Sequence, residues 1–327
     1  MPLKGWPVGG DDVSLDADAL ADRRRLKRRL FFWRSGAILV AAAALFVLAS
    51  REGTAPHRDQ IARIDVSGII VDDRDMQKLL EDLGETSRVK AVILSIDSPG
   101  GTTTGAEAFY EATRKLAGKK PVVAVLGTVA ASGGYIAAIS ADHIVARGNT
   151  LTGSIGVLFQ WTQFSGLMEK VGVEMREIKS APLKAEPNPF HAPSPEAIAA
   201  TKSLIDSSYD WFLDLVKERR GFDEATAHKL GDGRVYTGWQ AVDNGLVDQL
   251  GGEEQALAWL AREKKISKNL PVYDWQPRRP TDGFAGLTGR FMGSALSSAF
   301  ESVTGKTLEA KRLTLDGLVS LWHADRY

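Results

Sequence analysis

Short apolar runs alternate with segments of helical periodicity over most of the chain. The predicted strands are short runs rich in β-branched residues, and they cover residues 61–66, 89–97, 121–126, 143–146 and 173–178. Segments with apolar residues three and four apart predict helices between them, at residues 76–83, 106–117, 135–140 and 161–171. Strands separated by helices at this spacing predict βαβ units, and therefore an α/β fold whose sheet is covered on both faces.

The second half of the chain is mainly helical in pattern. It predicts helices at residues 195–219, 223–230, 238–244 and 253–264. Pro271, Pro277 and Pro280 then mark a boundary, beyond which apolar residues at helical spacing from Phe284 to Phe300 predict an amphipathic helix. Such a helix usually packs on its own core or on a second subunit, and a position on a membrane surface is the alternative.

One long apolar stretch lies near the N-terminus. Residues 35–49 carry no charge and follow a cluster of seven Lys and Arg residues between positions 23 and 34. A helix over residues 30–50 would be about 31 Å long at about 1.5 Å per residue, which is enough to cross the hydrocarbon core. We interpret it as an uncleaved signal anchor, with a signal peptide cleaved after Ala49 and a buried core helix as the alternatives. The positive-inside rule predicts a cytoplasmic N-terminus and an exported remainder.

Composition and charge exclude several classes of protein. The 327 residues are 44% apolar and 25% charged, which is typical of a globular chain with a sizeable core and excludes a disordered or collagen-like one. The absence of cysteine excludes disulfides, a thiolate nucleophile and a thiolate metal site. The 41 basic and 41 acidic residues balance, and the basic cluster leads directly into the apolar stretch, so we expect a membrane and no nucleic acid as its partner.

The same inventory gives no support for cofactor or metal chemistry. None of the five histidines lies in a cluster with metal-ligand spacing, and no glycine-rich dinucleotide signature follows the first predicted strand. We therefore expect no metal and no cofactor. His143 is a conceivable base for a serine nucleophile, but its place inside a predicted strand favours a structural role at the strand edge.

Two predicted loops at the carboxyl ends of strands carry candidate chemistry, and such loops should gather at one edge of the sheet. Residues 97–101 contain paired glycines, which can turn sharply and present backbone N–H groups to an anion. Residues 127–135 place Ser132 at a predicted helix start between small residues. Its hydroxyl would either cap the helix or act as an accessible nucleophile.

A third predicted loop, residues 178–190, contains Lys179 and Lys184. Either one is ordinarily a surface lysine. A serine protease without a usable histidine needs a neutral amine as base, and apolar surroundings lower the pKa of a lysine toward that state. Lys184, between Leu183 and Ala185, fits that role better than Lys179.

These segments belong to a set of motifs that follow one another in a fixed order. The set consists of Asp97-Ser-Pro-Gly-Gly101, Ala130-Ala-Ser-Gly-Gly-Tyr135, Thr150-Leu-Thr-Gly-Ser-Ile-Gly-Val157, the lysine loop, and Asp232-Gly-Arg-Val-Tyr-Thr-Gly238 with Gly245-Leu-Val-Asp-Gln-Leu-Gly251. Over residues 61–265 the chain thereby resembles the signal peptide peptidase A (SppA) family in its short, single-copy form. The resemblance implies a crotonase/Clp-protease-like α/β fold of the ββα superhelix type, following one N-terminal transmembrane helix.

The resemblance also implies residue roles. Ser132 corresponds to the nucleophile and Lys184 to the general base of a Ser-Lys dyad. Ser154 corresponds to the hydroxyl that orients the lysine, Gly101 corresponds to the oxyanion-hole glycine, and the N–H of Gly133 is the expected second donor. The implied activity is that of a membrane-anchored serine endopeptidase that degrades signal peptides, and other apolar peptides, left after preprotein processing.

The expected partners and location follow from the same resemblance. We expect a homo-oligomeric ring whose active sites are shared between protomers, in the bacterial inner membrane, with the catalytic domain in the periplasm. The predicted segments are a basic cytoplasmic tail (1–29), the anchor (30–50), a linker (51–60), the peptidase domain (61–275) and a C-terminal extension (276–327). A non-catalytic crotonase-like scaffold and an acyl-CoA enzyme of the crotonase type are the alternatives.

Overall fold

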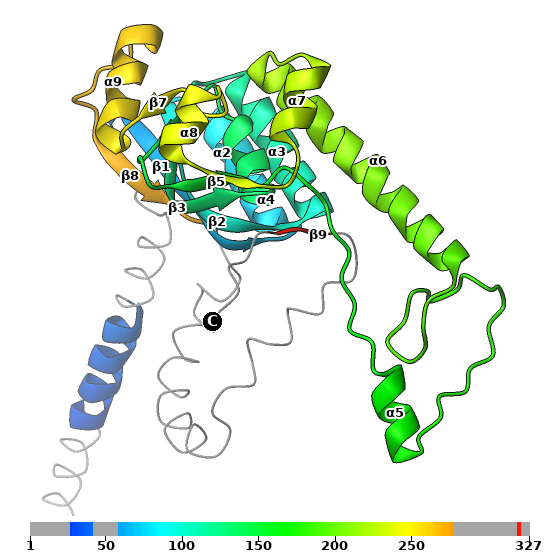
Figure 1. Ribbon diagram of the computed structural model, residues 1–327. Coiled ribbons are helices and arrows are strands. Elements are labelled where there is room, and N and C mark those ends of the chain that lie inside the picture. The colour runs from blue at the N-terminus through cyan, green and yellow to red at the C-terminus, as the bar shows by residue number, and fades with distance from the viewer. Residues whose placement is uncertain (1–26, 42–57, 278–318, 322–327) are drawn as a thin grey trace, which may run out of the picture. The chain divides into compact units, whose positions relative to one another are not determined.

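The computed structural model describes residues 27–41, 58–277 and 319–321 (Figure 1). The chain divides into two compact units, residues 1–57 and 58–327, each considered by itself. The described part of the first unit is a helix over residues 27–41. Among the described residues no helix combines the length and the apolar character needed to cross a bilayer. Residues 42–50 of the predicted anchor and the predicted helix at 284–300 lie outside the described residues.

The second unit is built on a mixed, mostly parallel sheet, which confirms the predicted α/β class. Its nine strands run in the order β6-β5-β3-β2-β1-β8, with β4, β7 and β9 paired off this path. The strands are β1 (Gln60–Ile70), β2 (Val89–Thr102), β3 (Val122–Ala131), β4 (His143–Ala146), β5 (Leu151–Gly153), β6 (Val235–Thr237), β7 (Gln249–Leu250), β8 (Val272–Trp275) and β9 (Val319–Leu321).

Helices cover both faces of this sheet, as the pattern predicts. They are α2 (Arg74–Glu85), α3 (Thr103–Ala117), α4 (Gly133–Ile139), α5 (Ser165–Val171), α6 (Pro195–Arg220), α7 (Glu224–Leu230), α8 (Gly238–Asp243) and α9 (Glu253–Lys264). Alternate residues of β2 point to opposite faces: Leu94 lies in the larger core with α2, α3, α4 and α6, and Ile93 lies in the smaller core under α9.

The central strands separate at their carboxyl ends. β2 and β3 pair in parallel up to Ser98 and Ala130, with a register shift after Ile96. β3 then pairs with β5, and β2 pairs with β9 in antiparallel register at Gly100–Thr102. β1 pairs with one edge of β2 at Gly100 and Gly101. β9 therefore pairs with the other edge, which is paired with β3 earlier in the strand. The place where the two strands diverge, at the end of β3, is here termed the opening.

The structure corrects three predicted segments, two at this edge and one outside the sheet. The predicted loops 97–101 and 127–135 are largely continuations of β2 and β3, because their backbone groups find partners in β1, β5 and β9. The predicted strand at 173–178 is exposed and irregular. A strand needs a hydrogen-bonding neighbour, and among the described residues none pairs with this segment.

Residues 157–194 form a segment that leaves the sheet and returns into α6, here called the arm (Figure 1). It contains α5 and the lysine loop. Its side chains are largely exposed, and the helix predicted at 161–171 is confirmed only as the shorter α5. The lysine loop therefore lies on the arm and does not meet the other two candidate segments at the sheet edge.

Candidate functional site

Ser132 lies at the junction between β3 and α4, in a backbone conformation that non-glycine residues rarely adopt. Its φ is 57° and its ψ is −118°, and its side chain is 2% exposed. The Ser132 N–H donates to the carbonyl of Gly153 at 2.8 Å, and its carbonyl accepts from Tyr135 N at 2.9 Å. The Ser132 side chain does not cap α4. Strained residues of this kind persist where the surrounding structure fixes them, and they cluster at functional sites.

Ser154 lies beside this junction at the end of β5. Ala131 and Gly153 are paired in the ladder between β3 and β5, so the residues that follow them, Ser132 and Ser154, start from adjacent positions. Ser154 has a φ of 48°, is 9% exposed, and its N–H donates to the carbonyl of Arg234 at 2.8 Å. Two strained serines thus stand next to each other at one end of the sheet.

The end of β2 forms the other wall of the opening. Gly101 pairs with Ile70 of β1, and a Cβ added at Gly101 would lie 1.8 Å from the carbonyl oxygen of Ile70. Gly134 of α4 is equally constrained, because a Cβ there would lie 2.5 Å from the carbonyl oxygen of Ser98. Glycine at both positions lets α4, β2 and β1 approach more closely than any side chain would permit.

Ser98 fixes the start of this glycine segment and is a residue that the sequence reasoning missed. It is fully buried, its hydroxyl donates to the carbonyl of Gly68 at 2.6 Å, and it accepts from the N–H of Gly100 at 3.1 Å. Thr152 plays a similar part for β3, since its buried hydroxyl donates to the carbonyl of Ala130 at 2.6 Å. In the sequence, the one sign of both roles is that Ser98 and Thr152 are small hydroxyl residues inside motifs at strand ends.

The side of β2 that faces the opening accepts an extended chain. β9 pairs there in antiparallel register, with Ser320 opposite Gly101 and Val319 opposite Thr102. Main-chain pairing of this kind is how an extended peptide adds to an exposed sheet edge. The arrangement can therefore bind a peptide backbone beside the β2 glycines and next to the β3–α4 junction.

The two lysines of the lysine loop differ in surroundings. Lys179 is paired with Glu177 at 2.6 Å and with Glu186, and these hydrogen bonds raise the pKa of its ammonium group. Lys179 is thereby held in the charged form, which is unsuited to a general base. Lys184 lies exposed in the turn between residues 182 and 185. Within one chain, Ser132 is buried between β3 and α4, while Lys184 is exposed on the arm.

His143 has a structural position. It begins β4 opposite Val123, near the start of β3, whereas Ser132 follows the far end of β3, about 30 Å away at about 3.3 Å per residue. The imidazole stacks on Trp259 with 4.6 Å between ring centroids, and burial lowers its pKa. This position agrees with the strand-edge interpretation and excludes His143 as a base for Ser132.

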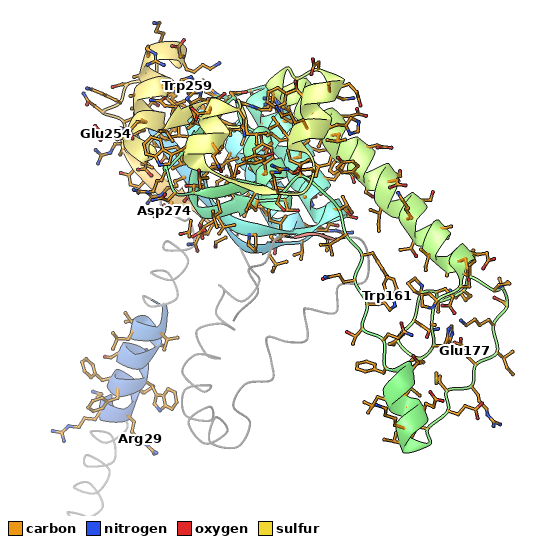
Figure 2. All side chains as sticks on the ribbon, in the orientation of Figure 1. Arg29, Trp161, Glu177, Glu254, Trp259 and Asp274 are labelled. Atoms are coloured by element: carbon orange, nitrogen blue, oxygen red, sulfur yellow. The ribbon has the colours of Figure 1, made fainter. Side chains whose placement is uncertain are left out.

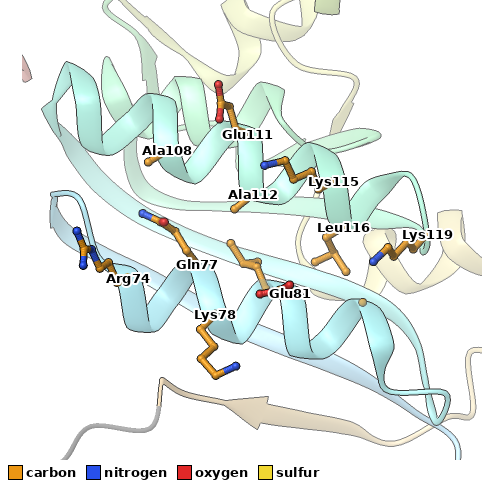
Figure 3. Close-up of a pocket in the computed structure, with 12 residues that line it drawn as sticks. Arg74, Gln77, Lys78, Glu81, Ala108, Glu111, Ala112, Lys115, Leu116 and Lys119 are labelled. Carbon is orange, nitrogen blue, oxygen red and sulfur yellow. The ribbon is translucent and has the colours of Figure 1, made fainter.

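Neither of two nearby hollows is lined by the candidate residues. A groove of about 720 Å³ between α2 and α3 is lined by charged side chains, among them Arg74, Glu81 and Lys115 (Figure 3). A pocket of about 510 Å³ lies against the end of β1, which pairs with the β2 glycines. Its lining mixes apolar side chains, such as Phe109, with the carboxylates of Asp65 and Asp73.

Comparisons with known proteins match the region that holds these residues. The family model described as peptidase family S49 matches residues 114–267, a region that contains both strained serines and the arm. A relative from Synechocystis sp., named as a protease, is 39% identical over 206 residues, which cover 62% of this chain and 74% of the relative. A relative from Enterococcus faecium, named as a signal peptide peptidase SppA, is 35% identical over 243 residues, which cover 69% of each chain.

A more distant relative is longer than this chain. Protease 4 of Haemophilus influenzae is 29% identical over 255 residues, which cover 75% of this chain but only 41% of that protein.

Proposed function

Because the chain belongs to peptidase family S49 and is a serine protease of the SppA type, we propose that Ser132 is its nucleophile and Lys184 its general base. One observation carries the assignment of Ser132. It is a buried serine in a strained conformation, located where β2 and β3 diverge and beside an edge that pairs with an extended chain. Among the described residues, no other serine combines these features.

The proposed reaction follows the usual course of acyl transfer. The neutral amine of Lys184 takes the proton of the Ser132 hydroxyl, and the serine oxygen attacks the peptide carbonyl. Backbone N–H groups of Gly101 and Gly133 hold the oxyanion, and each such donor is typically worth on the order of a hundredfold or more in rate. Protonated Lys184 then gives its proton to the leaving amine, and water hydrolyses the acyl-enzyme. Ser154 orients the lysine.

We also propose that Lys184 acts on a neighbouring copy of the chain within a ring. The support is its position on the arm together with the arm's exposed apolar surface. Exposed large apolar residues on the arm and the adjoining half of α6 are Trp161, Phe164, Leu167, Val171, Val173, Met175, Ile178, Leu183, Phe190, Ile198 and Leu204. An exposed apolar surface of this extent marks protein–protein contacts. A second copy that covers the arm would bury this surface and bring a lysine to Ser132.

The proposed substrates are signal peptides that remain in the membrane after preprotein cleavage. The support is the similarity to a relative that is named as a signal peptide peptidase SppA. The proposed location is the bacterial inner membrane, with residues 30–50 as a single anchor and the protease domain in the periplasm. The described helical residues 27–41 include part of the basic cluster and the start of the apolar stretch, which supports this topology.

The dyad is tested on the full-length chain with a fluorophosphonate probe and a model signal peptide. The expected adduct maps to Ser132. Ser132→Ala and Lys184→Ala should each abolish cleavage, and Lys184→Arg should too, because arginine keeps the charge but cannot become a neutral base. Lys170→Ala, on α5 of the same arm, serves as the control. Substantial cleavage by either alanine variant at position 132 or 184 would contradict the dyad.

Mixed oligomers test the shared site. When Ser132→Ala and Lys184→Ala chains are combined, a protomer with an intact serine meets a protomer with an intact lysine at some interfaces. Partial recovery of cleavage is expected, and it should vary with the mixing ratio. Mixed rings that are verified by mass and remain inactive would show that each chain supplies its own lysine.

A further inference from the structure

Residues 173–191, which include the lysine loop, have the outline of a hairpin but lack a backbone ladder. One leg covers residues 173–179, the other covers residues 186–191, and Lys184 stands in the turn between them. The backbone hydrogen bonds within this loop lie inside the turn, from Lys184 N to Ala181 O at 3.1 Å and from Glu186 N to Leu183 O at 3.4 Å. Among the described residues, no backbone hydrogen bond joins the two legs.

The sequence explains why a ladder does not form. Pro187 and Pro189 occupy alternate positions of the returning leg, so their missing N–H groups fall on the same edge. An extended strand with two successive gaps on one edge cannot donate a regular set of hydrogen bonds to its neighbour. The contacts that join one leg to the other therefore come from side chains.

A cluster of five side chains, which we term the clasp, joins the two legs (Figure 2, near Glu177). Its members are Glu177, Lys179, Glu186, Asn188 and His191. The ammonium group of Lys179 contacts Glu177 on its own leg at 2.6 Å and Glu186 on the other leg. His191 lies 3.2 Å from each of these carboxylates, and the Asn188 amide donates to Glu186 at 3.2 Å.

The clasp is also the best-shielded polar group of the arm. The Glu186 side chain is 7% exposed and that of Lys179 is 17% exposed, on a segment whose other side chains are largely in solvent. Breaking an ion pair that is shielded in this way is costly, because removing one partner leaves the other charge uncompensated. By contrast the neighbouring pair of Glu174 and Arg176 is 71% and 84% exposed and lies on one leg only.

We infer that Lys179 and Glu186 are positioning residues for the proposed base, because the contact between them closes the loop on both sides of the turn that carries Lys184. This inference rests on the proposed function. Lys184 follows Lys179 by five positions and precedes Glu186 by two, so the clasp fixes both ends of a short turn. The Lys179 ammonium supplies the positive charge that offsets the two carboxylates, and it takes no part in proton transfer.

The test compares Lys179→Met and Glu186→Gln with the matched control Glu174→Gln in the full-length protein. The two clasp variants should lower kcat by about a hundredfold, as expected when a catalytic group is misplaced by about 1 Å. KM should stay within about twofold, because the peptide pairs with β2 and not with the arm. The control should retain the parent kcat. Clasp variants whose kcat equals that of Glu174→Gln would overturn the inference.

Two further measurements distinguish a positioning role from proton transfer by Lys179 itself. Lys179→Arg should restore most of the kcat, since arginine can pair with both carboxylates but cannot serve as a neutral base, whereas Lys184→Arg stays inactive. Hydrogen exchange of the amides at residues 183–186 should speed up in Lys179→Met and not in the control. Exchange reports on the clasp even if Lys184→Ala proves active, so failure of the dyad and failure of the clasp are distinguishable.

Discussion

Single residues at the ends of β2 and β3 hold the proposed site in its shape. Ser132 has a conformation that is unfavourable for an L-amino acid, and it is maintained by backbone hydrogen bonds to Gly153 and from Tyr135. Ser98 holds the glycine segment of β2 in place, because its hydroxyl donates to the carbonyl of Gly68 and accepts from the N–H of Gly100. The site is thus specified by short polar contacts inside a buried region, where an unmade hydrogen bond is costly.

Ser98→Ala should lower both stability and rate. The change leaves the carbonyl of Gly68 and the N–H of Gly100 without this partner, at a cost of about 1–3 kcal/mol in the free energy of unfolding. Release of the Gly100–Gly101 segment should also reduce kcat. Denaturant unfolding and peptide cleavage measure the two effects. Ser67→Ala is the control, since Ser67 is exposed and donates only to Asp65. Equal behaviour of the two variants would show that Ser98 has no such role.

The sequence could identify these positions only in part. The order of motifs singles out Ser132, Ser154 and Gly101, and the structure brings all three to one end of the sheet. Ser98 and Thr152 were not singled out, because a small hydroxyl inside a motif has the same appearance whether it caps a helix, faces water or bridges two strands. Only the register of β1, β2 and β3 reveals what each hydroxyl contacts.

At the scale of elements, hydrophobic periodicity predicts the sheet better than its edges. The strands 61–66, 89–97, 121–126 and 143–146 and most helices are present near their predicted positions. The short strands β5 to β9 were not predicted, because segments of two to four residues carry only a weak periodic signal, and β4 is the one strand of that length that the pattern identified. The strand predicted at 173–178 is absent for a different reason, which is the lack of a pairing partner. Its β-branched residues fit a strand, but the proline-rich leg beside it cannot pair.

The contact between β4 and α9 predicts how stability depends on pH. Burial against Trp259 lowers the pKa of His143 below its unfolded value near 6.5. Above that value the imidazole is neutral in both states. As the pH falls below it, the unfolded state binds the proton more readily, so His143 reduces stability progressively until the pH passes its folded pKa.

The measurement is the melting temperature between pH 7 and pH 5 for the parent chain and for His143→Gln. Because other groups titrate over the same range, the informative quantity is the difference between the two curves. The parent should lose more stability on acidification than the variant. Parallel curves would show that His143 is not the group responsible. Cleavage at pH 7 serves as a check that the distant Ser132 site is intact.

At the scale of the whole molecule, we predict that the chain's own C-terminal segment competes with substrate for one surface. β9 occupies the side of β2 that faces the opening, with Ser320 opposite Gly101. A peptide bound for cleavage would need the same backbone groups of Gly100–Thr102, because β1 already occupies the other side of the strand. The two modes of pairing are therefore mutually exclusive, and β9 reduces the fraction of chains that are open to substrate.

Two truncations that differ by three residues test this competition. A chain that ends at position 318 lacks β9, while a chain that ends at position 321 retains it and loses only the residues that follow. The shorter chain should show a lower KM for an extended peptide and faster labelling of Ser132 by a fluorophosphonate, with kcat nearly unchanged, because only the accessible fraction of sites has risen. The longer chain should behave as the parent does. If both truncations match the parent in KM, the pairing of β9 with β2 is too weak to compete with substrate, and access to Ser132 is governed elsewhere.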